Sequence, residues 1–257
     1  MTAKALVLAA HGSRHEPAVN AQVRAWATEV AARTDFAEVA VAFHQGTPQF
    51  CEVLDELHAV DVTVVPVMTS AGYYSNTVLP RELARNRRYA EMQVRQTPLL
   101  GTHFGVIDLF IERADALAES SKDTTLAVVG HGTPRHPASR DSTHALVNEL
   151  SLRGGYGEVV AVFLDDDPPI ERLLAIARNP HIVVLPFFIG AGPHAILDIP
   201  TRIGMSVFGQ EPPFRQMVSG KNIICDAPLG AQPRLVDLIV DLACCPARNS
   251  FDEQEVA

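Results

Sequence analysis

Short apolar runs alternate along the chain with segments whose apolar residues recur at helical spacing. Runs rich in Val, Ile and Leu that end at Gly, His or Pro are typical of buried parallel strands. The predicted strands cover residues 4–10, 38–43, 62–68, 92–97, 125–130, 159–164, 182–188 and 222–227. Helices are predicted at 17–30, at 48–57, from about residue 76, and at 104–117. Strands that alternate with helices predict two α/β domains, each with a parallel sheet.

The second half of the chain repeats the first. The offset is 120 residues, from His11 to His131, and grows to 129, from Leu100 to Leu229, so the second copy has nine extra residues, which we place within 207–222. We interpret the repeat as a tandem duplication. It predicts an N-terminal domain at 1–121, a C-terminal domain at 122–246 and a polar tail at 247–257, with a cleft between the two domains.

Polar side chains follow the predicted strands directly. His11 and His131 come after the first strand of each copy, Asp165 and Asp166 after the second strand of the later copy, and His194 beyond its third strand. In parallel sheets, ligands bind outside the carboxyl ends of the strands. Imidazole is a common ligand for Fe(II), Co(II) and Ni(II), and it also acts as a general base. Both roles stay open at this point.

Composition and missing motifs narrow the function. A net charge of −9 argues against a nucleic-acid binder. No run of about 20 apolar residues predicts a membrane span, and the start of the chain does not resemble a signal peptide. The four cysteines form no CxxC pair, which favours reduced thiols and a cytoplasmic location. The chain contains no GxSxG, no GxxxxGK[ST] and no GxGxxG after the first strand, which argues against a hydrolase or a nucleotide-dependent enzyme.

Three motifs carry a resemblance to a known family. VLAAHGS at 7–13, VVGHGT at 128–133 and PFFIGAGPHAILDIP at 186–200 resemble the sirohydrochlorin and cobalt chelatases of the CbiX/SirB type, which are class II, ATP-independent chelatases. The resemblance spans about residues 4–244 and implies the long form with two chelatase-like domains. It implies insertion of a divalent metal into sirohydrochlorin or a related tetrapyrrole. Co²⁺ or Fe²⁺ would be the metal substrate, with Ni²⁺ as a further candidate, and no nucleotide would be needed.

The resemblance also implies roles for individual residues of the second copy. His131 matches the histidine of the HGS motif, His194 matches the histidine of the Gly-x-His loop, and Asp165 matches the acid after the second strand. These three are the predicted catalytic residues. The predicted metal ligands are His131, His194 and His11.

The first copy departs from the family pattern. It keeps His11, but Tyr74 replaces the loop histidine and Gln45 stands at the acid position. In long members of the family the first half commonly carries the metal site, so this chain reverses that arrangement. His44 is an alternative ligand, although neighbouring side chains of a strand point to opposite faces.

The macrocycle itself calls for aromatic and cationic side chains. Two tyrosines of the first copy are suited to stack on or hydrogen-bond to a flat ring, and arginines within 81–88, RELARNRR, match carboxylates in a bidentate way. The predicted substrate-binding residues are Tyr73, Tyr74, Arg81, Arg135, Ser13 and Thr133. The predicted partner is a tetrapyrrole, with no nucleic acid and no membrane, and the fused pair of domains predicts a monomer.

Other interpretations stay open. The altered first-copy motif is consistent with a non-catalytic carrier or scaffold that binds metal or tetrapyrrole, and a different small-molecule enzyme is possible on the same duplicated scaffold. The two HG histidines can also serve structural roles in loops after buried strands. Asp165 can act as a helix N-cap, and 81–88 can be a solvated helix face.

Overall fold

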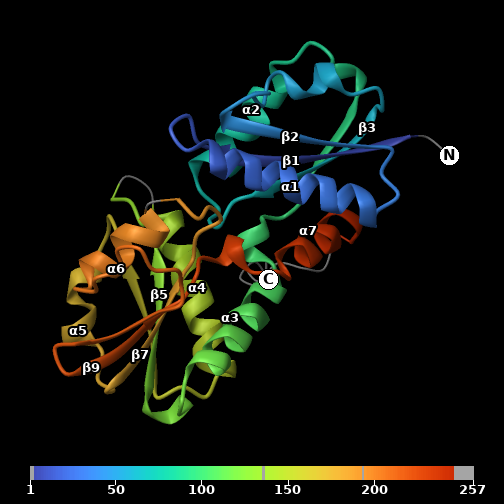
Figure 1. The fold of residues 1–257 in the computed structure, drawn as a ribbon. Coiled ribbons are helices and arrows are strands. Elements are labelled where there is room, and N and C mark those ends of the chain that lie inside the picture. Colours follow the sequence, from blue (N-terminus) through green and yellow to red (C-terminus); the bar gives the residue numbers. More distant parts are fainter. Residues whose placement is uncertain (1–2, 135–136, 193, 246–257) are drawn as a thin grey trace. The chain divides into compact units, whose positions relative to one another are not determined.

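The computed structural model describes residues 3–134, 137–192 and 194–245, which divide into two compact units (Figure 1). Unit 1 comprises the chain up to His103 together with the chain from Pro233 onward, and unit 2 comprises Phe104–Gln232. Each unit contains one sheet, largely parallel, with helices packed against it. The predicted fold class, two α/β domains with parallel sheets, is confirmed.

The sheet of unit 1 has four parallel strands in the order β2-β1-β3-β4. The strands are β1 (Lys4–Gly12), β2 (Glu38–Gln45), β3 (Asp61–Val67) and β4 (Gln93–Gln96). Residues 5–9 of β1 are fully buried, as expected for an apolar central strand whose two faces are both covered. The chain becomes polar and partly exposed where β1 ends, at His11 and Gly12, and this end of the sheet is therefore available for chemistry.

The sheet of unit 2 has the strand order β6-β5-β7-β9-β8. Its strands are β5 (Thr124–Gly130), β6 (Glu158–Phe163), β7 (His181–Pro186), β8 (Phe214–Val218) and β9 (Lys221–Cys225). The first four in spatial order are parallel and match the four predicted strands of the second copy. β8 was not predicted: it pairs antiparallel with β9 at the edge and lies within 207–222, the segment with the nine extra residues.

The helices agree with the sequence pattern in part: the helix predicted at 17–30 is longer than expected, whereas the helix predicted at 48–57 is much shorter. Unit 1 has α1 (Pro17–Arg33) and α2 (Leu79–Ala84), and unit 2 has α4 (Ala138–Arg153), α5 (Leu173–Ile176) and α6 (Ile199–Arg202). The helix predicted at 48–57 is reduced to one 3₁₀ turn, Val53–Glu56. The reason is that the Phe43 amide donates to the Pro48 carbonyl at 2.9 Å, which keeps the chain extended beside β2 before the turn begins.

The last helix of each copy packs in the other unit. α3 (Phe104–Leu117), from the first copy, lies against α4 and β7 of unit 2, whereas α7 (Leu235–Cys244), from the second copy, lies against α1 and β3 of unit 1 (Figure 1). The boundary of the sequence repeat, near residue 121, therefore does not coincide with the boundaries of the compact units. We call α3 and α7 the exchanged helices.

A π-helical turn follows the third strand in both copies. It spans Tyr74–Val78 in unit 1 and His194–Asp198 in unit 2, and in each case it leads directly into a short α-helix. π-helical turns are rare and are frequent at functional sites. The Gly-x-His motif of the second copy and its Tyr-bearing counterpart therefore both start such a turn.

Candidate functional site

Three rings gather at the carboxyl ends of the strands in unit 1. β1 and β2 pair in parallel with Gly12 opposite Gln45, so His11 lies level with His44. The ring centres of His11 and His44 are 5.2 Å apart. The ring centre of Tyr74 lies 4.6 Å from that of His11 and 4.8 Å from that of His44. We call these three residues the first-half ring cluster.

The sequence places Gln45 at the acid position and leaves His44 as an alternative ligand, because side chains of neighbouring strand residues point to opposite faces. The strand register instead places His44 beside His11. Tyr73 and Tyr74 are 48% and 40% exposed, with ring centres 5.8 Å apart, so both aromatic side chains present surface to a ligand.

Two other first-half residues predicted to bind substrate already have protein partners. The Ser13 hydroxyl oxygen accepts from the backbone amide of Glu16 at 3.0 Å, and its own amide donates to the Asn20 side chain at 2.9 Å. These bonds hold the turn after β1 at the start of α1. Arg81 forms an ion pair with Glu82 at 3.2 Å, but its side chain is 57% exposed, so the guanidinium stays accessible.

In unit 2, His131 and Asp165 come together at the ends of β5 and β6. The imidazole Nδ1 of His131 lies 3.4 Å from Oδ2 of Asp165. The backbone amide of Asp165 also donates to the His131 carbonyl at 2.9 Å, which ties the two turns to each other. Both side chains are about half exposed, so they are accessible to a ligand. The structure thus brings together two residues that the sequence places after two different strands of the second copy.

The surroundings of His131 define its tautomer. Nδ1 lies 3.0 Å from the backbone carbonyl oxygen of Gly132 and close to the Asp165 carboxylate, and both of these oxygens only accept hydrogen bonds. Nδ1 therefore carries the proton, and the lone pair of the neutral imidazole is on Nε2. In metal-binding histidines, one ring nitrogen typically donates its hydrogen to a carboxylate or carbonyl, and this bond orients the other nitrogen toward the metal.

The remaining predicted residues of the second copy are only partly described. The backbone of His194 begins the π-helical turn His194–Asp198, but its side chain lies outside the described part of the structure, as does Arg135. Thr133 is half-buried in the turn after His131. Within the described residues, no three His, Cys, Asp or Glu side chains converge closely enough to hold a metal ion by themselves.

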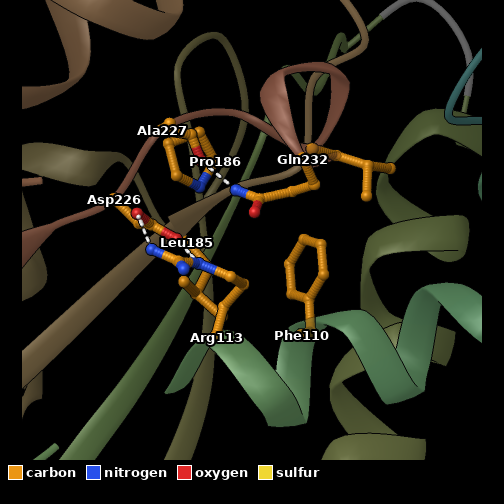
Figure 2. Close-up of a pocket in the computed structure, with 8 residues that line it drawn as sticks. Phe110, Arg113, Leu185, Pro186, Asp226, Ala227 and Gln232 are labelled. Carbon is orange, nitrogen blue, oxygen red and sulfur yellow. Dashed lines mark hydrogen bonds and ion pairs between the residues drawn. The ribbon is translucent and has the colours of Figure 1, made fainter. Parts of the chain in front are cut away.

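A small pocket in unit 2 is lined by none of the predicted site residues. It is lined by the exchanged helix α3 and by the ends of β7 and β9, with Phe110, Arg113, Pro186, Asp226 and Gln232 among its walls (Figure 2). Its volume of about 10 Å³ suits a single water molecule. Arg113 and Asp226 bind each other there, so the pocket is a packing feature of α3 and not a substrate site.

In the described part of the chain, no helix has the length and apolar character to cross a membrane.

Comparisons with known proteins agree with the motifs. The CbiX family model matches the chain twice, over residues 5–117 and 125–244. A probable sirohydrochlorin cobaltochelatase of Halobacterium salinarum is 29% identical over 264 residues, which cover 93% of this chain and 90% of that protein. The two matches of the family model follow the two copies of the repeat.

Solved structures are similar in fold. SirB from Bacillus subtilis, solved with Fe³⁺, aligns with a TM-score of 0.79 and 16% identity over 98% of this chain and all of that one. DR2241 of Deinococcus radiodurans, a multi-domain protein with structural similarity to chelatases, aligns with a TM-score of 0.77 and 23% identity over 98% of this chain. This chain spans 56% of the Deinococcus protein. With the fold, the two HG turns and a family match over both copies in place, the chain belongs to the CbiX family and is an enzyme of the chelatase class.

Proposed function

We propose that the protein inserts a divalent metal, Co²⁺ or Fe²⁺, into sirohydrochlorin or a related tetrapyrrole without ATP. The observation that carries the proposal is the His131–Asp165 pair at the strand ends of unit 2. Membership of the CbiX family, a relative named as a sirohydrochlorin cobaltochelatase and a structural relative solved with iron support the choice of substrate and metal.

His131, His194 and Asp165 are proposed to handle the metal and the protons. With Nδ1 held by the Gly132 carbonyl and by Asp165, the Nε2 lone pair of His131 is the donor for the incoming ion. Metal insertion exchanges one M²⁺ for two pyrrole N–H protons, so total charge is conserved and the new metal–nitrogen bonds provide the driving force. Neutral imidazole and carboxylate are bases suited to accept those protons at neutral pH.

The macrocycle is proposed to contact aromatic and cationic side chains. The exposed rings of Tyr73 and Tyr74 offer flat apolar surface, and the exposed guanidinium of Arg81 matches a peripheral carboxylate. Thr133 and Arg135, which follow His131 in the sequence, and Ser13 complete the proposed set. The placement of these residues around one macrocycle stays a prediction, as do a monomeric state and a cytoplasmic location.

His11 is proposed as a further metal ligand. Its neighbours His44 and Tyr74 make the first-half ring cluster the main rival location for the metal, because two imidazoles that share one ion at about 2.0–2.1 Å have ring centres about 5 Å apart, and those of His11 and His44 are separated by 5.2 Å. The second half is preferred because it has the carboxylate that the first half lacks.

One assay tests the function and its location. The purified protein is mixed anaerobically with Co²⁺ or Fe²⁺ and sirohydrochlorin, with and without ATP, and the absorbance change is compared with the uncatalysed rate. We expect acceleration that does not depend on ATP, a loss of about 100-fold or more for His131→Ala and for His194→Ala, and a smaller loss for His11→Ala.

The same assay identifies the alternatives. Binding of metal or tetrapyrrole without acceleration supports a carrier, and neither binding nor acceleration points to a different enzyme. If His11→Ala abolishes the reaction while His131→Ala leaves it intact, the metal is handled in the first half, and the assignment of the second-half residues is wrong.

A further inference from the structure

Among the described residues of unit 2, one buried carboxylate oxygen has no hydrogen-bond donor. The Asp166 side chain is only 9% exposed. Its Oδ1 accepts from the Asp167 amide at 2.8 Å and lies 3.6 Å from a guanidinium nitrogen of Arg140. Its Oδ2 is buried and has no partner among the described residues. Buried polar atoms in folded proteins nearly always have partners, so an unpartnered carboxylate oxygen calls for an explanation, such as a bound water or ion.

Asp166 lies directly against the turn that carries His131. A Cβ atom added to Gly132 would be 2.5 Å from Cβ of Asp166, and Gly132 has a φ of +70°. The preceding residue, Asp165, is bonded to the His131 backbone and faces the His131 ring. The unpartnered carboxylate is therefore adjacent to the proposed metal-handling pair.

The first copy of the repeat shows that this turn can be built without a buried charge. At the offset of 120 residues, Asp166 corresponds to Gly46 and Arg140 to Asn20. The Asn20 amide accepts from the Ser13 amide and donates to the Ser13 carbonyl, both at 2.9 Å, and it would lie 2.8 Å from a Cβ at Gly46. A neutral, well-bonded side chain thus holds the first-half turn.

The second copy has a charged pair in the same place. A buried carboxylate oxygen without a donor is destabilising, because it loses the hydrogen bonds that it makes to water in the unfolded chain, whereas the first copy holds the equivalent turn with a neutral, hydrogen-bonded side chain. Asp166 pairs with the guanidinium of Arg140, which is 41% exposed, and Asp165 adds a second carboxylate beside His131. The local arrangement therefore favours a cation.

We propose that Asp166 is a positioning carboxylate for a hydrated divalent cation at the His131–Asp165 pair. Its free oxygen accepts a hydrogen bond from a water molecule bound to the ion, while Nε2 of His131 contacts the ion itself and Asp165 orients the His131 ring through Nδ1. Arg140 balances the charge of Asp166 when the site is empty. The proposal rests on the proposed function, since it extends the second-half metal site.

Cobalt binding to the full-length protein tests the proposal. Co²⁺ alone is titrated calorimetrically into the wild type, Asp166→Asn and a matched control, Asp167→Asn, which removes the same charge from the exposed neighbouring residue. We expect Asp166→Asn to weaken Co²⁺ binding at least about tenfold, as removal of a residue that orients metal ligands typically does. Asp167→Asn should change it less than about twofold. Wild-type affinity in Asp166→Asn would overturn the proposal.

A double variant separates a metal role from a purely structural one. Arg140→Asn with Asp166→Gly builds the first-copy arrangement into the second copy. If Asp166 only supports the turn, the double variant should have the melting temperature and the Co²⁺ affinity of the wild type, and that result would overturn the proposal. We expect the melting temperature to be kept while Co²⁺ affinity stays at least about tenfold reduced and the KM for metal, not for tetrapyrrole, is raised.

His131→Ala distinguishes the two levels of inference. Loss of Co²⁺ binding in His131→Ala combined with normal binding in Asp166→Asn overturns only the role of Asp166. Normal Co²⁺ binding and insertion in His131→Ala overturn the proposed function and the role of Asp166 with it.

Discussion

Arg113 holds Asp226 through two parallel hydrogen bonds, from Nε to Oδ2 at 2.8 Å and from Nη2 to Oδ1 at 2.9 Å (Figure 2). The Asp226 side chain is 1% exposed and that of Arg113 is 33% exposed. The hydrogen bonds to Asp226 raise the pKa of Arg113, which keeps the guanidinium charged. Arg113 belongs to α3 and Asp226 follows β9, so the pair fastens an exchanged helix to the sheet of unit 2.

Removal of Arg113 should destabilise unit 2 strongly. Arg113→Ala leaves the buried Asp226 carboxylate without its cation, and breaking a buried pair in this way typically costs about 3–5 kcal/mol. Urea unfolding of the wild type and the variant measures the difference. Arg178→Ala is the control, because Arg178 is 88% exposed and pairs with Glu158 at 3.5 Å, which predicts a loss below about 1 kcal/mol. Equal losses in the two variants would contradict the view that α3 is held by this pair.

Gly230 should not tolerate a side chain. A Cβ atom there would lie 1.5 Å from the Ile189 carbonyl oxygen, and its counterpart in the first copy, Gly101, approaches the Thr69 carbonyl in the same way. Gly230→Ala should lower the free energy of unfolding by about 2 kcal/mol or more, because the backbone has to move. Gly72→Ala is the control: its nearest neighbour would be 4.0 Å away, and its thermal midpoint should stay close to that of the wild type.

Tyr74→His should strengthen metal binding in the first half. The Tyr74 ring lies close to both His11 and His44. A third imidazole would replace a phenol, which holds its proton at neutral pH and is the weaker ligand for Co²⁺. We expect about a tenfold gain or more in Co²⁺ affinity when the change is made in a His131→Ala background, which removes the second-half site. Calorimetric titration without any gain would mean that the ring cluster is closed to cations.

Glu38 should stabilise the folded state of unit 1 when its carboxyl group is ionised, and this contribution should be lost at acidic pH. The backbone amide of His58 lowers the pKa of Glu38, and the amide of Ala59 adds to the effect. Because the folded-state pKa lies below the unfolded value of about 4.3, the contribution is complete above that pH and is lost as pH falls through the folded-state pKa.

The variant Glu38→Gln measures this contribution. It should cost about 1–2 kcal/mol at pH 7, since a charged acceptor of backbone amides becomes neutral, and the difference should disappear as pH falls through the lowered folded-state pKa of Glu38. Urea unfolding at several pH values follows it, with Glu29→Gln on the 52%-exposed Glu29 as the control. A constant difference at all pH values would show that the charge of Glu38 does not matter.

Much of the fold is predictable because its signals are local. A few residues are enough to recognise these elements: β1 and β5 are continuous apolar runs, and α1 begins with a Pro. The edge strand β8 is different: it has only five residues and alternates buried and exposed positions, so it lacks a continuous apolar run. The exchange of α3 and α7 cannot be read from periodicity either, since an apolar helix face fits equally well against either sheet.

The site could be predicted only as far as residue types and strand ends allow. His131 and Asp165 were expected to meet because both follow parallel strands, and they lie 3.4 Å apart. That His44 lies beside His11 could not be predicted, because it depends on the register of β1 and β2, which requires the strand pairing to be known. The unpartnered oxygen of Asp166 depends on three-dimensional burial and has no signature in the sequence.

The exchanged helices have a consequence for how such a chain arises. In a single copy of the repeat, the sheet would lack the helix that covers it here, which is α7 in unit 1 and α3 in unit 2. The last helix of that copy would in turn lack the second sheet against which it packs. Two separate copies would cover both sheets if they formed a symmetric, domain-swapped dimer in which each copy packs its last helix on the other. Fusion of the two copies in one gene keeps this helix exchange within one molecule. Each half can then change its ligand residues independently, as the non-identical equivalent residues Tyr74 and His194 illustrate.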